Sequence, residues 1–109
     1  MAKATYYQKA SNLDYVNSSG SKIEANTIIV LGDRIGIAGC DIDAGETGAI
    51  VVEGVFKMPK SSASAIAAGA EVYFDGTGIT TTSSSNTRAG FAAAAAAAAD
   101  TQILVSINA

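Results

Sequence analysis

The sequence of 109 residues has no histidine, no tryptophan, one cysteine and one proline. Without histidine the chain lacks the commonest general base and the commonest metal ligand, so by itself it cannot assemble a Ser-His-Asp or Cys-His nucleophile. One cysteine excludes an internal disulfide and any zinc site built from several thiolates. Acid–base chemistry by carboxylates alone remains open, but the sequence assigns no carboxylate pair to a common pocket.

Charged residues are scarce as well, at 16% of the chain, and their balance is acidic, with a net charge of −3. Domains that bind nucleic acid are usually basic, and the seven Lys and Arg residues are scattered, so we expect no nucleic-acid partner. No apolar run approaches the roughly 20 residues that span a bilayer, which predicts no membrane contact. No signal peptide is visible, so we expect synthesis in the cytoplasm, where Cys40 stays reduced.

The chain is nevertheless apolar enough to fold, because 49% of its residues are hydrophobic. Of these, 22 are alanine, which adds little buried area, and aromatic residues make up only 6% of the chain. The core must therefore come mainly from Val, Ile and Leu. A chain of this length forms one domain that buries roughly two-thirds of its unfolded surface, so we expect a single domain over residues 1–109.

An internal repeat gives the chain its organisation. Residues 18–31 align without a gap on residues 61–74, and a second ungapped match places residues 34–51 on residues 88–105. Each copy reads, in order, as a polar turn, an apolar strand, Arg-x-Gly, an apolar strand, an acidic-Thr turn and an apolar strand. The second register sets Ile50 on Leu104.

Two copies of one unit predict a domain with approximate internal two-fold symmetry, and two copies are too few for a solenoid. We divide the domain into an N-terminal arm or ribbon over residues 1–17, a first repeat over residues 18–57 and a second repeat over residues 61–108.

Enrichment in β-branched residues between Gly, Asn, Asp and Ser predicts strands, and the chain is expected to be all-β. Pro59 cannot donate a hydrogen bond to a neighbouring strand, so it belongs at a strand end or a sheet edge. Aspartate at Val52 or Gly54 should unfold the domain by burying a charge. The expected strands are Thr27–Leu31, Arg34–Ala38, Ala49–Lys57, Ala70–Phe74 and Ile103–Asn108.

Two segments are harder to assign. Residues 92–99 are all alanine, the best helix former, but eight residues are too few for a stable isolated helix. The repeat favours a strand over Phe91–Ala94 and a turn over Ala95–Ala99. Residues 77–87 are rich in Gly, Ser and Thr, which predicts an exposed loop with at most a short edge strand at Ile79–Thr82.

Three motifs partly match known binding or reactive sites, but each lacks residues that such a site requires. Gly76-Thr77-Gly78 is not followed by the Lys and hydroxyl residue that a phosphate loop needs. Asp41, Asp43 and Glu46 have metal-like spacing but not the full calcium-loop pattern, so we interpret them as a solvated acidic turn. Cys40 has no cationic neighbour in sequence to lower its pKa, so it is not expected to be reactive. No cofactor and no metal are predicted.

Four residues are candidates for contact with a partner. Arg34 and Arg88 occupy equivalent positions of the repeat, where they serve either as a pair of partner contacts or as two structural ion pairs. Tyr6 and Tyr7 serve either as interface anchors, as aromatic residues often do, or as ordinary strand residues of the core. The sequence alone leaves both alternatives open.

Five segments of the chain follow a known pattern: Val30–Ala38, Ile42–Gly48, Gly54–Lys60, Ala65–Asp75 and Asp100–Asn108. Together they resemble a family of small phage head proteins, the capsid decoration or cement proteins of tailed phages and prophages. These proteins often carry a recombinase label, which the missing phosphate loop contradicts here. The alanine tract departs from the family pattern, and so does Asn26, which stands where glycine is usual.

The resemblance implies a β-sandwich or jelly-roll-like barrel that binds the outer surface of the mature head as a homo-oligomer, either a dimer or a trimer. Its partner would be the major capsid protein, whose neighbouring subunits it would bridge, and no catalytic activity is implied. The alternative is a ligand- or glycan-binding β-module that is accessory to a phage particle.

Overall fold

The computed structural model describes residues 1–6 and 11–109, and these contain nine β-strands and no helix. The prediction of an all-β chain is therefore confirmed. None of the described residues forms a helix that could cross a membrane. The strands are β1 (Asn12–Val16), β2 (Ile28–Leu31), β3 (Arg34–Ala38), β4 (Thr47–Val51), β5 (Val55–Pro59), β6 (Glu71–Phe74), β7 (Ile79–Thr80), β8 (Thr87–Ala92) and β9 (Gln102–Ile107).

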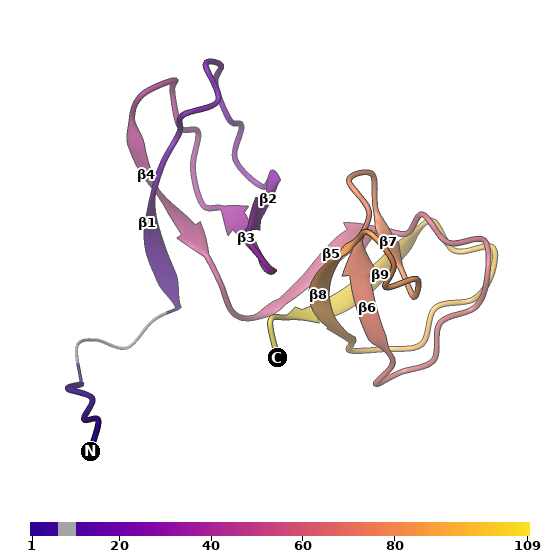
Figure 1. The fold of residues 1–109 in the computed structure, drawn as a ribbon. Coiled ribbons are helices and arrows are strands. Elements are labelled where there is room, and N and C mark those ends of the chain that lie inside the picture. Colours follow the sequence, from indigo (N-terminus) through magenta and orange to yellow (C-terminus); the bar gives the residue numbers. More distant parts are fainter. Residues whose placement is uncertain (7–10) are drawn as a thin grey trace.

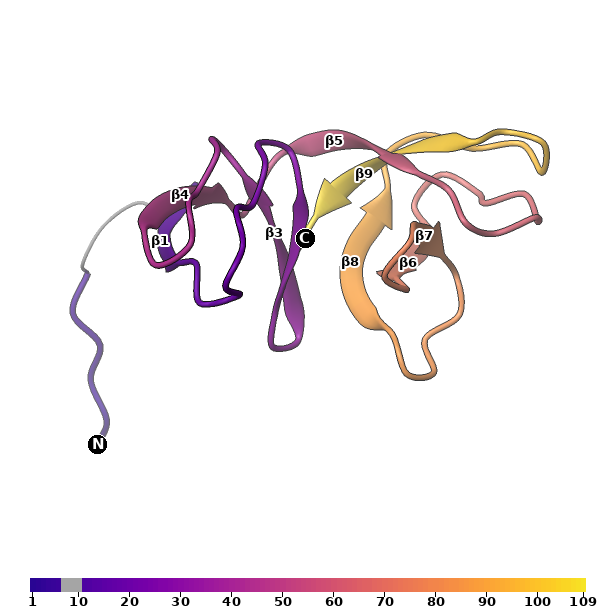
Figure 2. The same cartoon turned by 90° about the horizontal axis from the view of Figure 1, so that it is seen from above.

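The described strands form two antiparallel sheets, one in each half of the chain (Figure 1). The first sheet has the order β1-β4-β3-β2 and the second the order β5-β9-β8-β6-β7. Seen from above, the two sheets lie beside each other, with β3 facing β8 across the middle of the molecule (Figure 2). This arrangement is compatible with the expected β-sandwich.

The first sheet buries residues on both of its faces. Ile29 pairs with Gly36 and Ala38 pairs with Ile50, and this face forms a small core with Ile42. On the opposite face, Ile35 and Ile37 of β3 belong to the main core, which they share with the second sheet. Because the side chains of a strand alternate between faces, the apolar run of β3 contributes to both cores at once.

The second sheet curls until its two ends meet. A parallel bridge joins Ile79 of β7 to Lys60, the residue after β5, and the Ser61 N–H donates to the Ile79 carbonyl at 3.0 Å. Ile79 is completely buried in the main core. The short edge strand expected at Ile79–Thr82 is found as β7, two residues shorter, at the edge of the sheet. The expected exposure is wrong at Ile79, because this one large apolar side chain of Thr77–Thr87 closes the sheet. Residues 81–85 are exposed, as expected.

The single strand expected over Ala49–Lys57 is also wrong, because the structure divides it between β4 and β5, which belong to different sheets. The break lies at Gly54, which is exposed and has φ +122°, a conformation that side chains rarely adopt. The run of valines on both sides concealed the break, since it is equally suited to one long strand or two short ones. Each of the other four expected strands is found, within one residue at either end.

The alanine tract forms no helix. Strand β8 ends at Ala92, the next two residues form a bend, and Ala96 pairs with Ile66 in an isolated bridge. Ala92 and Ala96 are buried in the main core, whereas most of the tract is exposed. The prediction of a strand followed by a turn rather than a helix is confirmed, but the strand ends two residues before the expected Ala94, and Ala96 pairs within the expected turn. The pairing with residues 66–70 prevails over the helix propensity of alanine.

The two halves share a set of backbone hydrogen bonds at positions that the sequence alignment equates. Asn26 N–H donates to the Ala38 carbonyl, and Gly69 N–H donates to the Ala92 carbonyl. The isolated bridge Ile23–Ile42 in the first half likewise has its counterpart in the bridge between residues 66 and 96. Asn26 adopts φ +71°, and its counterpart Gly69 adopts φ +83°. A two-fold axis relating the halves stays a prediction.

The alignment fails at the last strand by one residue. Ala38 pairs with Ile50, and its equivalent Ala92 pairs with Val105 rather than with Leu104. Ile50 and Val105 are both buried, while Leu104 is 39% exposed. A slip of one residue moves every side chain of a strand to the other face, so the burial pattern corrects the register.

Candidate functional surface

The two arginines of the repeat differ in their contacts. Arg88 on β8 forms an ion pair with Glu71 of β6, and its Nη2 donates to the Ala109 carbonyl at 2.8 Å. The Arg88 guanidinium holds the pKa of the Glu71 carboxyl below its usual value. Arg34 is exposed at the start of β3 and takes part in neither of the two ion pairs found among the described residues.

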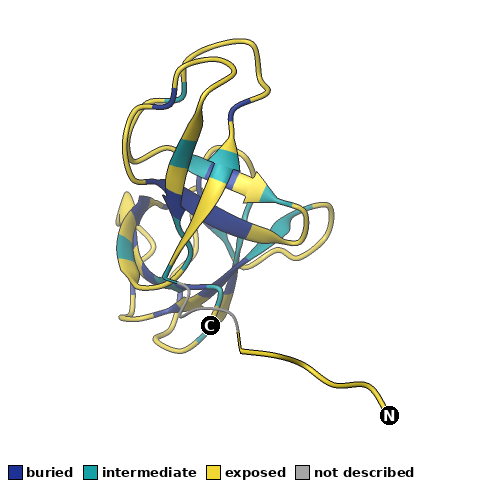
Figure 3. Cartoon of the chain, turned by 90° about the vertical axis from the view of Figure 1, so that its left-hand side faces the viewer, coloured by how far each residue is buried: buried dark blue, intermediate teal, exposed yellow. Residues whose placement is uncertain are grey.

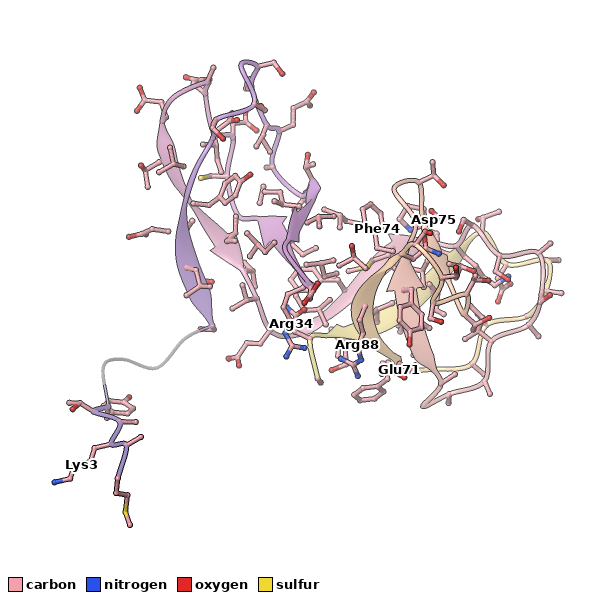
Figure 4. All side chains as sticks on the ribbon, in the orientation of Figure 1. Lys3, Arg34, Glu71, Phe74, Asp75 and Arg88 are labelled. Carbon is pink, nitrogen blue, oxygen red and sulfur yellow. The ribbon has the colours of Figure 1, made fainter. Side chains whose placement is uncertain are left out.

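Figure 4 shows Arg34 and Arg88 on different sheets, at the part of the molecule where the chain reaches its C-terminus. The contacts of the two residues agree with this view, since Arg34 lines a pocket with Asn108 and Arg88 binds Ala109. The structure therefore brings both arginines to the C-terminal residues, one from each sheet. The sequence offered two interpretations of these arginines, partner contacts or structural ion pairs. Among the described residues, Arg88 forms such an ion pair and Arg34 does not.

The aromatic candidates lie on the N-terminal arm. Residues 1–6 have no regular secondary structure, and they are exposed throughout (Figure 3). The Tyr6 side chain is 82% exposed, so it contributes nothing to the core of its own chain. Tyr7 lies outside the described residues. An exposed aromatic residue on an extended segment is the kind of group that anchors protein interfaces.

The acidic turn is held by an ion pair. Asp41 accepts a hydrogen bond from the Ala25 N–H at 2.8 Å and lies 3.3 Å from Lys22 Nζ. The hydrogen bond from Ala25, and then the hydrogen bond and the charge of Lys22, hold the pKa of the Asp41 carboxyl below its usual value. In the part of the chain that the structure describes, no three His, Cys, Asp or Glu side chains are grouped closely enough to hold a metal ion. Cys40 beside this turn is exposed and unpaired with any other cysteine.

A pocket that the sequence did not reveal lies where the first sheet meets the end of β9. We call it the junction pocket, and its volume is about 260 Å³. Asn108 closes one side of the pocket, with its side-chain amide bonded to the Ile35 backbone and to the Val52 carbonyl. The lining consists of Leu13, Leu31, Arg34, Ile35, Val52 and Asn108.

A second surface feature is an apolar strip on the outer face of the second sheet. Val55 and Phe91 both pair with Ser106, one from each side, so the three side chains form one row across β5, β9 and β8. Leu104 lies two residues from Ser106 and therefore on the same face. Val55 is 58% exposed. Only the register of the strands, which the sequence misaligned by one residue, brings these side chains together.

The comparisons with known proteins identify the family of this chain. A family model described as phage cement protein matches residues 7–107. The chain belongs to the phage cement protein family. No curated protein and no solved structure matches the chain.

Membership in the phage cement protein family confirms the resemblance that the sequence motifs indicated. It places the protein on the virion, in association with the phage capsid. The family is structural and is not known to be enzymatic, which agrees with a chain that carries no histidine. The described surface carries three features that a partner could contact: an exposed arm, an apolar pocket and an apolar strip.

Proposed function

We propose that this protein binds the outer surface of the mature phage head as a homo-oligomer and stabilises the shell by bridging neighbouring major capsid subunits. The match to the phage cement protein family over nearly the whole chain is the observation that carries this proposal. The protein would be made in the cytoplasm of the bacterial host. No nucleic acid or membrane takes part, because an acidic protein on the outside of the head is separated from the packaged DNA.

The fold suits a bridging role. Both sheets are tied to one main core through Ile35 and Ile37, so the molecule can transmit a load from one half to the other. Each contact with the shell can be weak, because an oligomer that touches several capsid subunits gains affinity through effective concentration. We assign the contacts with the capsid or with other copies to Tyr6, Tyr7, Arg34 and Arg88.

Co-sedimentation with undecorated capsids of the same phage tests this function. Purified protein is mixed with unexpanded capsids and, separately, with expanded capsids. We expect saturable binding to the expanded form, at a fixed ratio to the capsid protein, and an increase in the temperature at which those capsids open. Absence of binding to both forms would refute the proposal.

A second candidate function is binding of a soluble ligand or glycan. The observation that favours it is an open polar hollow of about 470 Å³ along residues 19–27, which offers the side chains of Ser19, Lys22 and Glu24. A glycan screen by thermal shift tests it, since a ligand of the folded state raises the melting temperature in proportion to the logarithm of its concentration. A melting temperature that no glycan changes would exclude this candidate.

A further inference from the structure

The junction pocket offers apolar walls and one cation to whatever enters it. Its amide group, from Asn108, is already bonded: Nδ2 donates to the carbonyls of Ile35 at 2.7 Å and Val52 at 2.9 Å, and Oδ1 accepts from the Ile35 N–H at 3.2 Å. Ile35 is fully buried at the base, whereas Leu13 is 40% exposed at the rim. The pocket therefore suits an apolar side chain better than a polar ligand.

The size and the charge of the junction pocket favour a single large aromatic side chain as its occupant. A volume of about 260 Å³ is below the roughly 300–1,000 Å³ of ordinary small-molecule sites, so one large side chain fills it. Arg34 is exposed beside the apolar walls and belongs to neither described ion pair. A guanidinium is attracted to the face of an aromatic ring, and a tyrosine can also keep its hydroxyl in water at the rim.

The chain itself carries such a residue on the arm that leads into β1. Tyr6 is 82% exposed, and seven residue steps separate it from Leu13, which lines the pocket. The Val52 N–H, in another lining residue, donates to the Ser11 carbonyl, so the arm leaves the body beside the pocket. Residues 1–6 lie away from both sheets in Figures 1 and 2.

We propose that Tyr6 of one molecule inserts into the junction pocket of a second copy, with its ring against Arg34, and that this exchange of arms builds the homo-oligomer. Each molecule both gives an arm and receives one, as in a reciprocal dimer or a closed ring of copies. The inference deepens the self-association part of the proposed function. It requires no capsid, so its failure is distinguishable from a failure to bind the head.

Cross-linking between single-cysteine variants tests the exchange, in a background where Cys40→Ser removes the native thiol. Thr5→Cys protein, which keeps Tyr6, is mixed under mild oxidation with Leu13→Cys protein, and one of the two is isotopically labelled so that the mixed disulfide is distinguished from disulfides between like chains. The control partner is Val55→Cys, which is more exposed than Leu13 but lies on the outer face of the second sheet. We expect the mixed disulfide with Leu13→Cys to form several-fold faster than that with Val55→Cys.

Equal rates with the two partners would overturn the proposal. A double variant, Thr5→Cys with Leu13→Cys in one chain that keeps Tyr6, supplies a second measurement: a product that remains monomeric after oxidation would show that the arm returns to its own pocket, and would also overturn the proposal. In sedimentation velocity, Tyr6→Ala should weaken self-association about tenfold or more, while Lys3→Ala on the same arm should leave it unchanged. A wild-type protein that is monomeric at every concentration would contradict the exchange directly.

Discussion

At the scale of the residue, short polar side chains hold this protein together at places where the backbone alone cannot. Asn17 is fully buried and bonds the backbone of Ser21 and Ile42, and it also accepts from Ser19. Asp75 plays the same part in the turn between β6 and β7 (Figure 4). Asn and Asp favour such local bonds to nearby backbone N–H groups, which is why they are common in turns.

Asp75 should make the protein sensitive to acid. Its carboxylate accepts hydrogen bonds from Ser61 Oγ at 2.6 Å, from the Thr77 N–H and from the Gly78 N–H, and these hold its pKa well below the usual 3.8. The stabilisation is therefore complete above about pH 4 and is lost as the pH falls toward the folded-state pKa. We expect Asp75→Asn to lower the melting temperature at neutral pH. Below pH ~4 the melting temperature of the variant should fall less steeply with pH than that of the wild type.

The matched control is Asp14→Asn, at an exposed carboxylate on β1. Melting temperatures are measured from pH 7 to pH 3 for the wild type and both variants. If Asp75→Asn and the wild type lost stability in parallel over this range, the bonds of Asp75 would not be the source of acid sensitivity.

Gly54 corrects the physical reason for an expected loss of stability. The sequence predicted that Gly54→Asp unfolds the protein by burying a charge, but this residue is exposed, and an added Cβ would meet only the Phe56 ring at 3.5 Å. The cost lies in its φ of +122°, about 1–3 kcal/mol for any side chain. We expect Gly54→Ala and Gly54→Asp to reduce the free energy of unfolding by similar amounts in urea. A much larger loss for Asp would restore the charge-burial explanation.

At the scale of the element, single residues at the ends of short strands make contacts that hold the sheets together. β7 has two residues, yet it pairs with β6 and, through Ile79, also reaches Lys60 after β5. At Gly90 of β8, an added Cβ would overlap the Ser106 carbonyl oxygen, so β8 and β9 approach more closely than any side chain there allows. The second sheet curls because such contacts draw its strands together.

Ile79 should be one of the most sensitive residues of the chain. Its side chain is completely buried in the main core, so Ile79→Ala should cost about 2–5 kcal/mol through lost burial and the cavity left behind. Val30→Ala on β2 serves as a control, because Val30 is about half exposed and its loss should cost under ~1 kcal/mol. Urea denaturation followed by circular dichroism measures both. Equal costs would mean that residues 77–87 form the exposed loop that the sequence predicted.

At the scale of the whole molecule, Asn108 joins the two halves. It follows β9 of the second sheet, and its side-chain amide pairs with Ile35 of the first sheet much as a neighbouring strand would. The same amide binds the Val52 carbonyl in the segment that connects the sheets. A protein that resists force on a shell needs its halves to unfold as one unit, and this residue contributes directly to that coupling.

Asn108→Ala should weaken the coupling of the two sheets. Three backbone groups lose their partner, at a cost of about 1–3 kcal/mol. Calorimetry should then give a van't Hoff enthalpy that falls below the calorimetric enthalpy, because the halves no longer unfold together. Asn108→Gly is the matched variant, since glycine accepts φ +58° without strain. If Asn108→Gly melts like the wild type, the side-chain amide is not needed to couple the sheets, and the effect of Asn108→Ala comes from the backbone conformation at this residue.

Local sequence patterns were sufficient to predict many elements of this protein. Short apolar runs between turn residues predicted four of the strands, and the repeat predicted that the alanine tract would be a strand and a turn. The family motifs predicted the cement protein family, which the comparison confirmed. The absence of histidine removed the usual catalytic groups from the amino-acid composition alone. All of these depend on residue types and on spacings within a few positions.

Contacts between distant residues settled the rest, and they exist only in the folded chain. Four features depend on contacts between segments that lie far apart in the chain. They are the break at Gly54, the burial of Ile79, the register of Leu104 and the junction pocket around Asn108. A run of valines suits one long strand as well as two short ones, and a single isoleucine among serines and threonines has no local signal of burial. Only the pairing of the strands in the folded sheets selects among these alternatives, because a shift of one residue in the pairing decides which side chains of a strand are buried.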